Sequence, residues 1–125
     1  MATVLVIEDE MNIRLFVSAN LEARGYTVLE AARGDEALAI SKEHSGPIHL
    51  LVTDVVLPGM NGRELAAALS SARPGVKTVF MSGYPGETLG RYGIVAMDID
   101  FLQKPFPAAA LAQKVRQALD APRAE

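Results

Sequence analysis

The sequence predicts an α/β domain in which a parallel sheet is covered by helices on both faces. Five apolar, β-branched runs begin near residues 3, 27, 49, 77 and 99, and helical patterns fill the intervals between them. Strands that alternate with amphipathic helices are typical of βαβ units and a parallel sheet. The runs at residues 4–7 and 50–52 are continuously apolar, as expected of strands buried on both faces.

The first helix is expected over residues 10–24, because apolar residues recur there at helical spacing. Gly25 follows in the position that often ends a helix. Leu15 lies off the apolar stripe and should be partly exposed. The stripe consists of Ile13, Phe16, Val17 and Leu21.

The next two helices begin at recognisable signals. A helix is expected from Gly34 to just before Gly46, with two acids in its first turn, where the helix dipole favours negative charge. The third helix should begin after Asn61 as its N-cap, with Glu64 completing a capping box, and should stop before Pro74.

The sequence favours the last two expected helices to different degrees. One is expected after Pro105, where Leu111, Val115 and Leu119 are spaced by four residues. The other would fall on residues 85–93, which contain three glycines. Each glycine inside a helix costs about 1 kcal/mol relative to alanine. We therefore expect a short, weakly held helix there.

Composition predicts one soluble domain over residues 1–121, followed by a frayed tail over residues 122–125. A chain of 125 residues, half of them apolar, can form a single core. The net charge of −3 argues against binding to nucleic acid or an anionic membrane surface. The chain has no cysteine, no signal-peptide pattern and no apolar segment long enough to span a membrane. We therefore expect a cytoplasmic location and no membrane insertion.

Reactive side chains follow four of the five apolar runs. Because parallel strands end at one edge of a sheet, these side chains should converge there. Each one has an ordinary interpretation, such as a helix cap, a turn or a solvated lysine, but four coincident strand ends favour a functional site. The residues concerned are Glu8 and Asp9, Asp54, Ser82, and Lys104.

The charges of such a site require compensation. Three carboxylates and one ammonium leave a formal charge of −2 at neutral pH. A divalent cation would neutralise it, and oxygen ligands suit Mg²⁺, with Mn²⁺ as a substitute, better than zinc. Phosphoryl transfer needs mainly such positioning and neutralisation. Asp54 is the candidate nucleophile, with Lys104 and Ser82 as donors to the phosphoryl oxygens.

The chain resembles the receiver domain of two-component response regulators over residues 3–119. The resemblance implies a flavodoxin-like three-layer sandwich whose five-stranded parallel sheet has the order 2-1-3-4-5 and is flanked by five helices. The matching motifs are Glu8-Asp9-Glu10, Asp54 with Pro58-Gly59-Met60-Asn61-Gly62, Ser82-Gly83, and Lys104-Pro105-Phe106.

The resemblance also implies roles for these residues. Asp54 would accept a phosphoryl group from a phosphohistidine on a histidine kinase or a histidine phosphotransfer protein. Mg²⁺ would be held by Asp9, Asp54 and the backbone carbonyl of Val56, with Glu8 acting through water. Lys104 would contact the phosphoryl group and precede a cis proline. The chain would not be an enzyme but a phosphoacceptor that assists its own phosphorylation and dephosphorylation.

Ser82 and Phe101 match the two switch positions of the family. Phosphorylation would turn Ser82 inward and change the face made by residues 85–93, the last strand and the last helix. Phe101 has no hydroxyl, so it would act by packing alone. Val56 and Tyr84 would restrict the attacking water, which predicts a long-lived acyl phosphate. The protein would be a monomer or a phosphorylation-dependent dimer.

Three alternatives remain open from the sequence. The chain could be a receiver-like interaction module that works without phosphorylation. It could be a flavodoxin-type carrier of FMN, although residues 8–10 would repel the flavin phosphate. It could be a haloacid-dehalogenase-like phosphatase, but Val56 stands where that class has a second acid. The segments 82–84 and 101–106 resemble those of receiver domains attached to hybrid sensor histidine kinases. In that case the parent protein would be an enzyme.

Overall fold

The protein is described by a computed structural model that covers residues 2–83 and 100–120. Five parallel strands form one sheet in the order β2-β1-β3-β4-β5, which confirms the predicted topology. The strands are β1 (Thr3–Ile7), β2 (Thr27–Ala31), β3 (Leu50–Asp54), β4 (Lys77–Ser82) and β5 (Asp100–Gln103). The helices within the described ranges are α1 (Met11–Ala23), α2 (Gly34–Glu43), α3 (Gly62–Ala72) and α5 (Ala108–Asp120).

Several predictions fall on parts of the chain outside the described residues. They concern the fifth flanking helix over residues 85–93, the contribution of Tyr84, and the tail over residues 122–125. The fold class is confirmed by the sheet order and by the four described helices.

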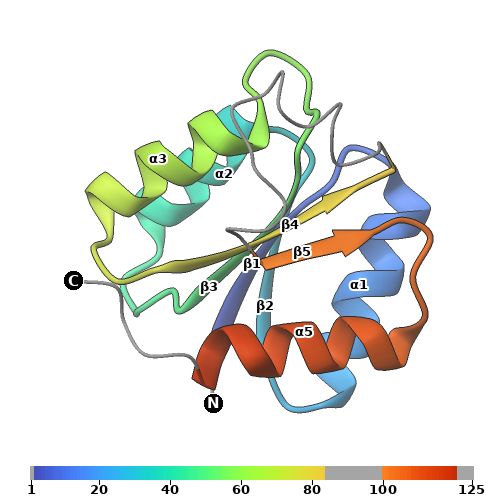
Figure 1. The fold of residues 1–125 in the computed structure, drawn as a ribbon. Helices are drawn as coiled ribbons and strands as arrows, with labels where there is room; N and C mark the ends of the chain where they lie inside the picture. Colours follow the sequence, from blue (N-terminus) through green and yellow to red (C-terminus); the bar gives the residue numbers. More distant parts are fainter. Residues whose placement is uncertain (1, 84–99, 121–125) are drawn as a thin grey trace.

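The sheet separates two apolar cores. Helices α1 and α5 cover one face and α2 and α3 cover the other (Figure 1). Alternate residues of β1 serve the two sides: Val4 and Val6 pack with α1 and α5, whereas Leu5 and Ile7 pack with α2 and α3. All four are fully buried, which explains the continuously apolar run in the sequence.

The helix ends follow the predicted chemistry. At the start of α1, the carboxylate of Glu10 accepts a hydrogen bond from the amide of Ile13. At its end, Gly25 has a φ of 93°, a left-handed conformation that glycine adopts without a steric penalty. Helix α3 has the full capping box, in which Asn61 and Glu64 each accept from the other's amide.

Arg73 fastens the end of α3 to the end of α2. Its guanidinium donates to the hydroxyl of Ser41 and to the carbonyls of Ser41, His44 and Gly46, at 2.7–2.8 Å. These carbonyls lie in the last turn of α2 and in the loop that follows it, where a helix leaves acceptors unsatisfied. Arg73 therefore adds a polar link between the two helices that cover this face of the sheet.

The predicted apolar stripe of α1 is correct for Val17 and Leu21, which are fully buried, but wrong for Phe16. Phe16 is 39% exposed and meets Phe106 at a ring-centroid distance of 6.3 Å. Leu15 is 52% exposed, as expected. None of the helices in the described part of the chain has the length and apolar character to cross a bilayer.

Candidate phosphoacceptor and metal site

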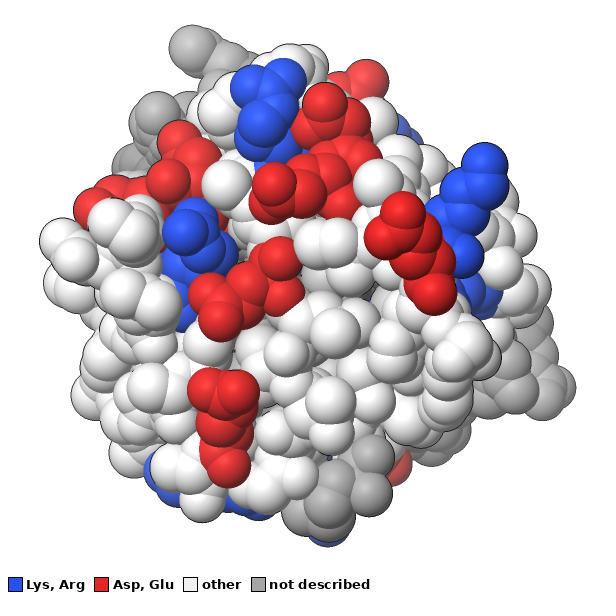
Figure 2. All heavy atoms as spheres, turned by 180° about the vertical axis from the view of Figure 1, so that it is seen from behind, with Lys and Arg blue, Asp and Glu red and all other residues white. Residues whose placement is uncertain are grey.

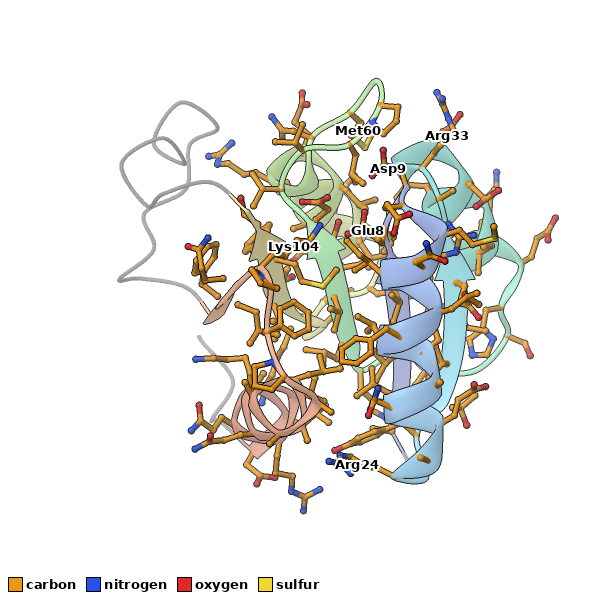
Figure 3. All side chains as sticks on the ribbon, turned by 90° about the vertical axis from the view of Figure 1, so that its right-hand side faces the viewer. Glu8, Asp9, Arg24, Arg33, Met60 and Lys104 are labelled. Carbon is orange, nitrogen blue, oxygen red and sulfur yellow. The ribbon has the colours of Figure 1, made fainter. Side chains whose placement is uncertain are left out.

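The predicted acidic residues meet at the carboxyl end of the sheet. Glu8 and Asp9 follow β1, and Asp54 is the last residue of β3, the strand beside it. Each carboxylate offers one oxygen atom, and these three atoms all lie within 4.8 Å of one another. Figure 3 shows Glu8, Asp9 and Lys104 grouped at the end to which the strands point. The convergence expected from the strand ends is thus present.

Lys104, which follows the edge strand β5, supplies the positive charge that faces these acids. Its ammonium donates to Glu8 Oε1 and, at 3.0 Å, to Asp54 Oδ2. The lysine follows β5, and its amide donates to the carbonyl of Ser82 at 2.7 Å, which fixes the start of the loop. The peptide bond to Pro105 is cis, as predicted.

The exposure of the acidic side chains differs. The Glu8 side chain is 1% exposed and that of Asp54 is 13% exposed, whereas Asp9 is open to solvent. Glu8 Oε2 also accepts from the amide of Glu10 at 3.0 Å. Glu8 is therefore a buried acid whose two oxygens each accept a hydrogen bond, and Asp54 is both paired with an ammonium and accessible from outside.

Burial and charge move two pKa values in this cluster. Burial raises the pKa of Glu8, and the neighbouring Asp54 carboxylate adds to the rise, so the hydrogen bonds from Lys104 and Glu10 only partly offset it. Burial alone would lower the pKa of Lys104, but its hydrogen bonds and charge attraction to Glu8 and Asp54 together raise it. The ammonium is therefore firmly charged at neutral pH.

The wider surface is acidic at this end of the molecule. Viewed from behind Figure 1, most acidic side chains on the visible face lie in its upper half, with a few basic ones among them (Figure 2). A concentration of negative charge raises the local concentration of cations. The setting therefore favours a site for a positively charged ion.

The loop after β3 presses the start of α3 against the main chain of Asp54. The amide of Gly62 donates to the carbonyl of Val55 at 2.7 Å. A Cβ atom at Gly62 would lie 2.3 Å from the carbonyl oxygen of Asp54, so a residue with a side chain does not fit there. Gly59 has a φ of 80°, which turns the loop back toward the helix.

The remaining predicted residues lie around the acids. Ser82 ends β4 and is fully buried, and its carbonyl holds the amide of Lys104. Phe101, on β5, and Val56, two residues after Asp54, both pack partly buried against the pair formed by Val55 and Phe80. The switch roles of Ser82 and Phe101 and the ligand role of Val56 stay predictions.

Two features were not foreseen in the sequence. The first is an open pocket of about 560 Å³ between α1 and the loop after β5. Three large apolar side chains of α1, Met11, Leu15 and Phe16, are exposed, and Phe16 lines this pocket. Met11 and Leu15 do not line the pocket, so no sequence pattern marked it in advance. The pocket is lined by Asn12, Ile13, Phe16, Gly83, Lys104, Pro105 and Phe106.

The second is Arg14, whose guanidinium reaches the end of β1. Its Nη1 donates to the carbonyl oxygen of Glu8 at 2.8 Å, and its Nε lies 3.4 Å from Glu30 Oε1. An arginine in the first turn of an amphipathic helix is usually a solvated residue, so its position in the sequence carries no signal of this contact.

Known proteins are similar to this chain in sequence. The model of the response regulator receiver domain matches residues 4–116. The sensor kinase CckA of Brucella abortus (strain 2308) is 41% identical over 119 residues, which are 95% of this chain but 13% of that protein. The response regulator receiver protein CpdR of the same organism is 32% identical over 119 residues, covering 95% of this chain and 98% of that protein.

Solved structures agree with the sequence matches. The receiver domain from the hybrid histidine kinase CckA superimposes with a TM-score of 0.80 at 37% identity, covering 95% of this chain and all of that one. The chemotaxis response regulator CheY4 of Vibrio cholerae gives a TM-score of 0.82 at 30% identity, with coverages of 95% and 99%. The family match, the sheet order and the acidic cluster beside a lysine lead to one conclusion: this chain belongs to the receiver domain family of two-component response regulators.

Proposed function

We propose that the chain is a signal-transduction phosphoacceptor in which Asp54 takes a phosphoryl group from a phosphohistidine. The donor would be a histidine kinase or a histidine phosphotransfer protein. The observation that carries this proposal is the environment of Asp54: its carboxylate contacts the ammonium of Lys104 at 3.0 Å and remains 13% exposed. Glu8 shares the ammonium but is too deeply buried for a donor to reach.

The donor set fits a hard divalent cation. The three carboxylates supply only oxygen ligands, and with Lys104 the cluster has a formal charge of −2. Mg²⁺ prefers such ligands and keeps several waters, so an incomplete protein shell suits it, and Mn²⁺ can replace it. Asp9, Asp54 and the carbonyl of Val56 would hold the ion, with Glu8 acting through water. When bound, the ion would neutralise charge on the phosphoryl oxygens.

The chain's own residues divide the remaining tasks. An oxygen of Asp54 forms the new bond to phosphorus while the bond between phosphorus and the donor's imidazole nitrogen breaks, and that nitrogen keeps the electron pair. Lys104 neutralises phosphoryl oxygens from the position in which it now contacts Asp54. The hydroxyl of Ser82 supplies a further hydrogen bond, and Phe101 transmits the change by repacking against its apolar neighbours.

The apolar pocket beside Lys104 supports a protein as the phosphodonor. It joins the acidic cluster through Lys104, which belongs to both, and it is lined on α1 by the exposed ring of Phe16. A helix that carries the phosphohistidine could lie there with its apolar side chains on Phe16 and its phosphoryl group at Asp54. The partner of the proposed reaction is therefore a helical protein surface.

The similarity to the sensor kinase CckA supports placing the domain in a hybrid sensor histidine kinase. The match to CpdR, which spans nearly all of that protein, supports a separate receiver protein instead. In either setting the proposed reaction of Asp54 is the same.

Phosphorylation by acetyl phosphate and Mg²⁺, followed by intact-mass spectrometry, tests the proposal. The wild type should gain the mass of one phosphoryl group, and Asp54→Ala should gain none. Asp35→Ala, which removes an exposed acid from α2 outside the cluster, is the matched control and should be phosphorylated normally. Equal phosphorylation of the Asp54 variant and the wild type would refute the assignment.

A further inference from the structure

Arg14 connects the acidic end of β1 to the edge of the sheet. It lies in the first turn of α1, and its side chain is 19% exposed. Nη1 donates to the carbonyl of Glu8 at 2.8 Å, while Nε faces the carboxylate of Glu30 at 3.4 Å. Glu30 belongs to the edge strand β2 and is paired in register with Val6 of β1. The carboxylate of Glu30 thus holds the guanidinium at Nε, and the guanidinium holds the carbonyl of Glu8 through Nη1.

The bond to Glu8 fixes a peptide plane that lies between two acids. A peptide unit is planar, so the carbonyl of Glu8 and the amide of Asp9 turn together. The amide of Glu8 is itself held by the carbonyl of Ala31 at 3.1 Å. Fixing the Glu8 oxygen therefore limits the directions in which both acidic side chains leave the main chain.

We propose that Arg14 is a positioning residue for the divalent-cation site, acting through the main chain of Glu8 and Asp9 rather than by contact with the ion. The inference rests on the metal site of the proposed function. It adds a residue outside the acidic cluster whose removal weakens cation binding. Partners that orient metal ligands commonly contribute 10–100-fold to affinity. Because Arg14 acts through one main-chain bond, the expected effect is about tenfold, at the lower end of that range.

The charge of Arg14 and its hydrogen bond to Glu8 have opposite expected effects on cation binding. Arg14 is a cation close to a proposed cation site, so if only its charge mattered, its removal would reduce repulsion and tighten binding. If its hydrogen bond orients the acids, its removal weakens binding. The sign of the change in the dissociation constant therefore separates the two explanations.

Isothermal titration calorimetry with MgCl₂ at neutral pH provides the measurement. Arg14→Gln should raise the dissociation constant for Mg²⁺ about tenfold. Arg24→Gln is the matched control, because it removes the same charge from an exposed position at the opposite end of α1 from Glu8 and Asp9 (Figure 3). That variant should bind Mg²⁺ like the wild type.

A second variant and a second readout distinguish positioning from a general loss of structure. Arg14→Lys keeps the charge, but its single ammonium cannot reproduce the two-sided contact, so its affinity should lie between those of the wild type and Arg14→Gln. It also decides the matter if the glutamine variant does not fold. At saturating Mg²⁺, phosphorylation of the variants by acetyl phosphate should approach the wild-type rate, since the defect lies in affinity.

Each outcome bears on a different claim. Wild-type affinity in both Arg14 variants, or tighter binding in Arg14→Gln, would overturn the positioning role while leaving the metal site intact. A wild-type protein that binds no Mg²⁺ would overturn the metal part of the proposed function and this inference with it. Weaker binding in the Arg14 variants, with Arg24→Gln unchanged, supports both.

Discussion

Replacing Gly62 with alanine should strongly destabilise the domain, because the added methyl group has no room. It would lie 2.3 Å from the carbonyl oxygen of Asp54 and 3.1 Å from Cα of Val55. Both are main-chain atoms, which cannot rotate away as the end of a side chain can. The amide of Gly62 also donates to Val55 at 2.7 Å, so the helix cannot retreat without losing that bond.

The size of the effect follows from two opposing contributions. Overpacking of a close contact costs typically 1–3 kcal/mol, and a clash with rigid backbone belongs at the upper end. Alanine is favoured over glycine inside a helix by up to about 1 kcal/mol, which offsets part of the loss. We expect the free energy of unfolding to fall by about 2 kcal/mol, which lowers the Tm of a domain of this size by roughly 8 °C.

Two other glycines provide controls for urea and thermal unfolding followed by circular dichroism. In Gly34→Ala, the new atom would meet the thioether of Met60 at 2.9 Å, and this flexible side chain can move, so the loss should stay under about 1 kcal/mol. In Gly83→Ala, no atom beyond the residue itself and its two chain neighbours lies within 4 Å of the added methyl group, so the free energy of unfolding should not change. A Gly62 variant as stable as the Gly83 variant would show that the reasoning is wrong.

Three further predictions concern charge and capping. In EDTA, Asp54→Asn should raise the free energy of unfolding by about 1 kcal/mol, because it removes one of three crowded carboxylates while Glu8 keeps the ammonium of Lys104 paired. Mg²⁺ should stabilise the wild type but not this variant. Also in EDTA, the free energy of unfolding should fall as the pH rises from about 4.5, the ordinary pKa of a glutamate, through the raised pKa of Glu8 in the folded protein. The reason is that the folded state binds the proton of the Glu8 carboxyl more tightly than the unfolded state does. Glu8→Gln should flatten this part of the pH profile. Asn61→Ala should lower the free energy of unfolding by about 1 kcal/mol in urea titrations, because α3 loses its capping box, and an unchanged midpoint would contradict this.

The strands and the convergence of the site were predictable because both depend on local patterns. Apolar runs show where buried strands lie, and parallel strands bring whatever follows them to one edge. Asp54 and Lys104 could therefore be placed together although 50 residues separate them. The strand order came from the resemblance of the motifs, since apolar patterns do not show which strands are neighbours.

The contacts that were missed depend on three-dimensional approach rather than pattern. Helical spacing puts Phe16 beside the buried stripe, but its exposure is decided by how closely the loop after Lys104 approaches α1. The bond from Arg14 ends on a main-chain carbonyl, which every residue has and no sequence motif marks. The glycine at position 62 looks like an ordinary turn residue until the distance to Asp54 is known.

The bridge made by Lys104 has a consequence for the order in which the domain can be completed during synthesis. Lys104 lies 96 residues after Glu8, so almost the whole chain separates the acid from its counter-charge. A nascent chain that has emerged only as far as β4 carries Glu8, Asp9 and Asp54 with no ammonium among them. No side chain of the protein therefore offsets the repulsion among these acids until the C-terminal part has left the ribosome. Without a bound cation, shortened chains that end before β5 should be least stable at the acidic cluster.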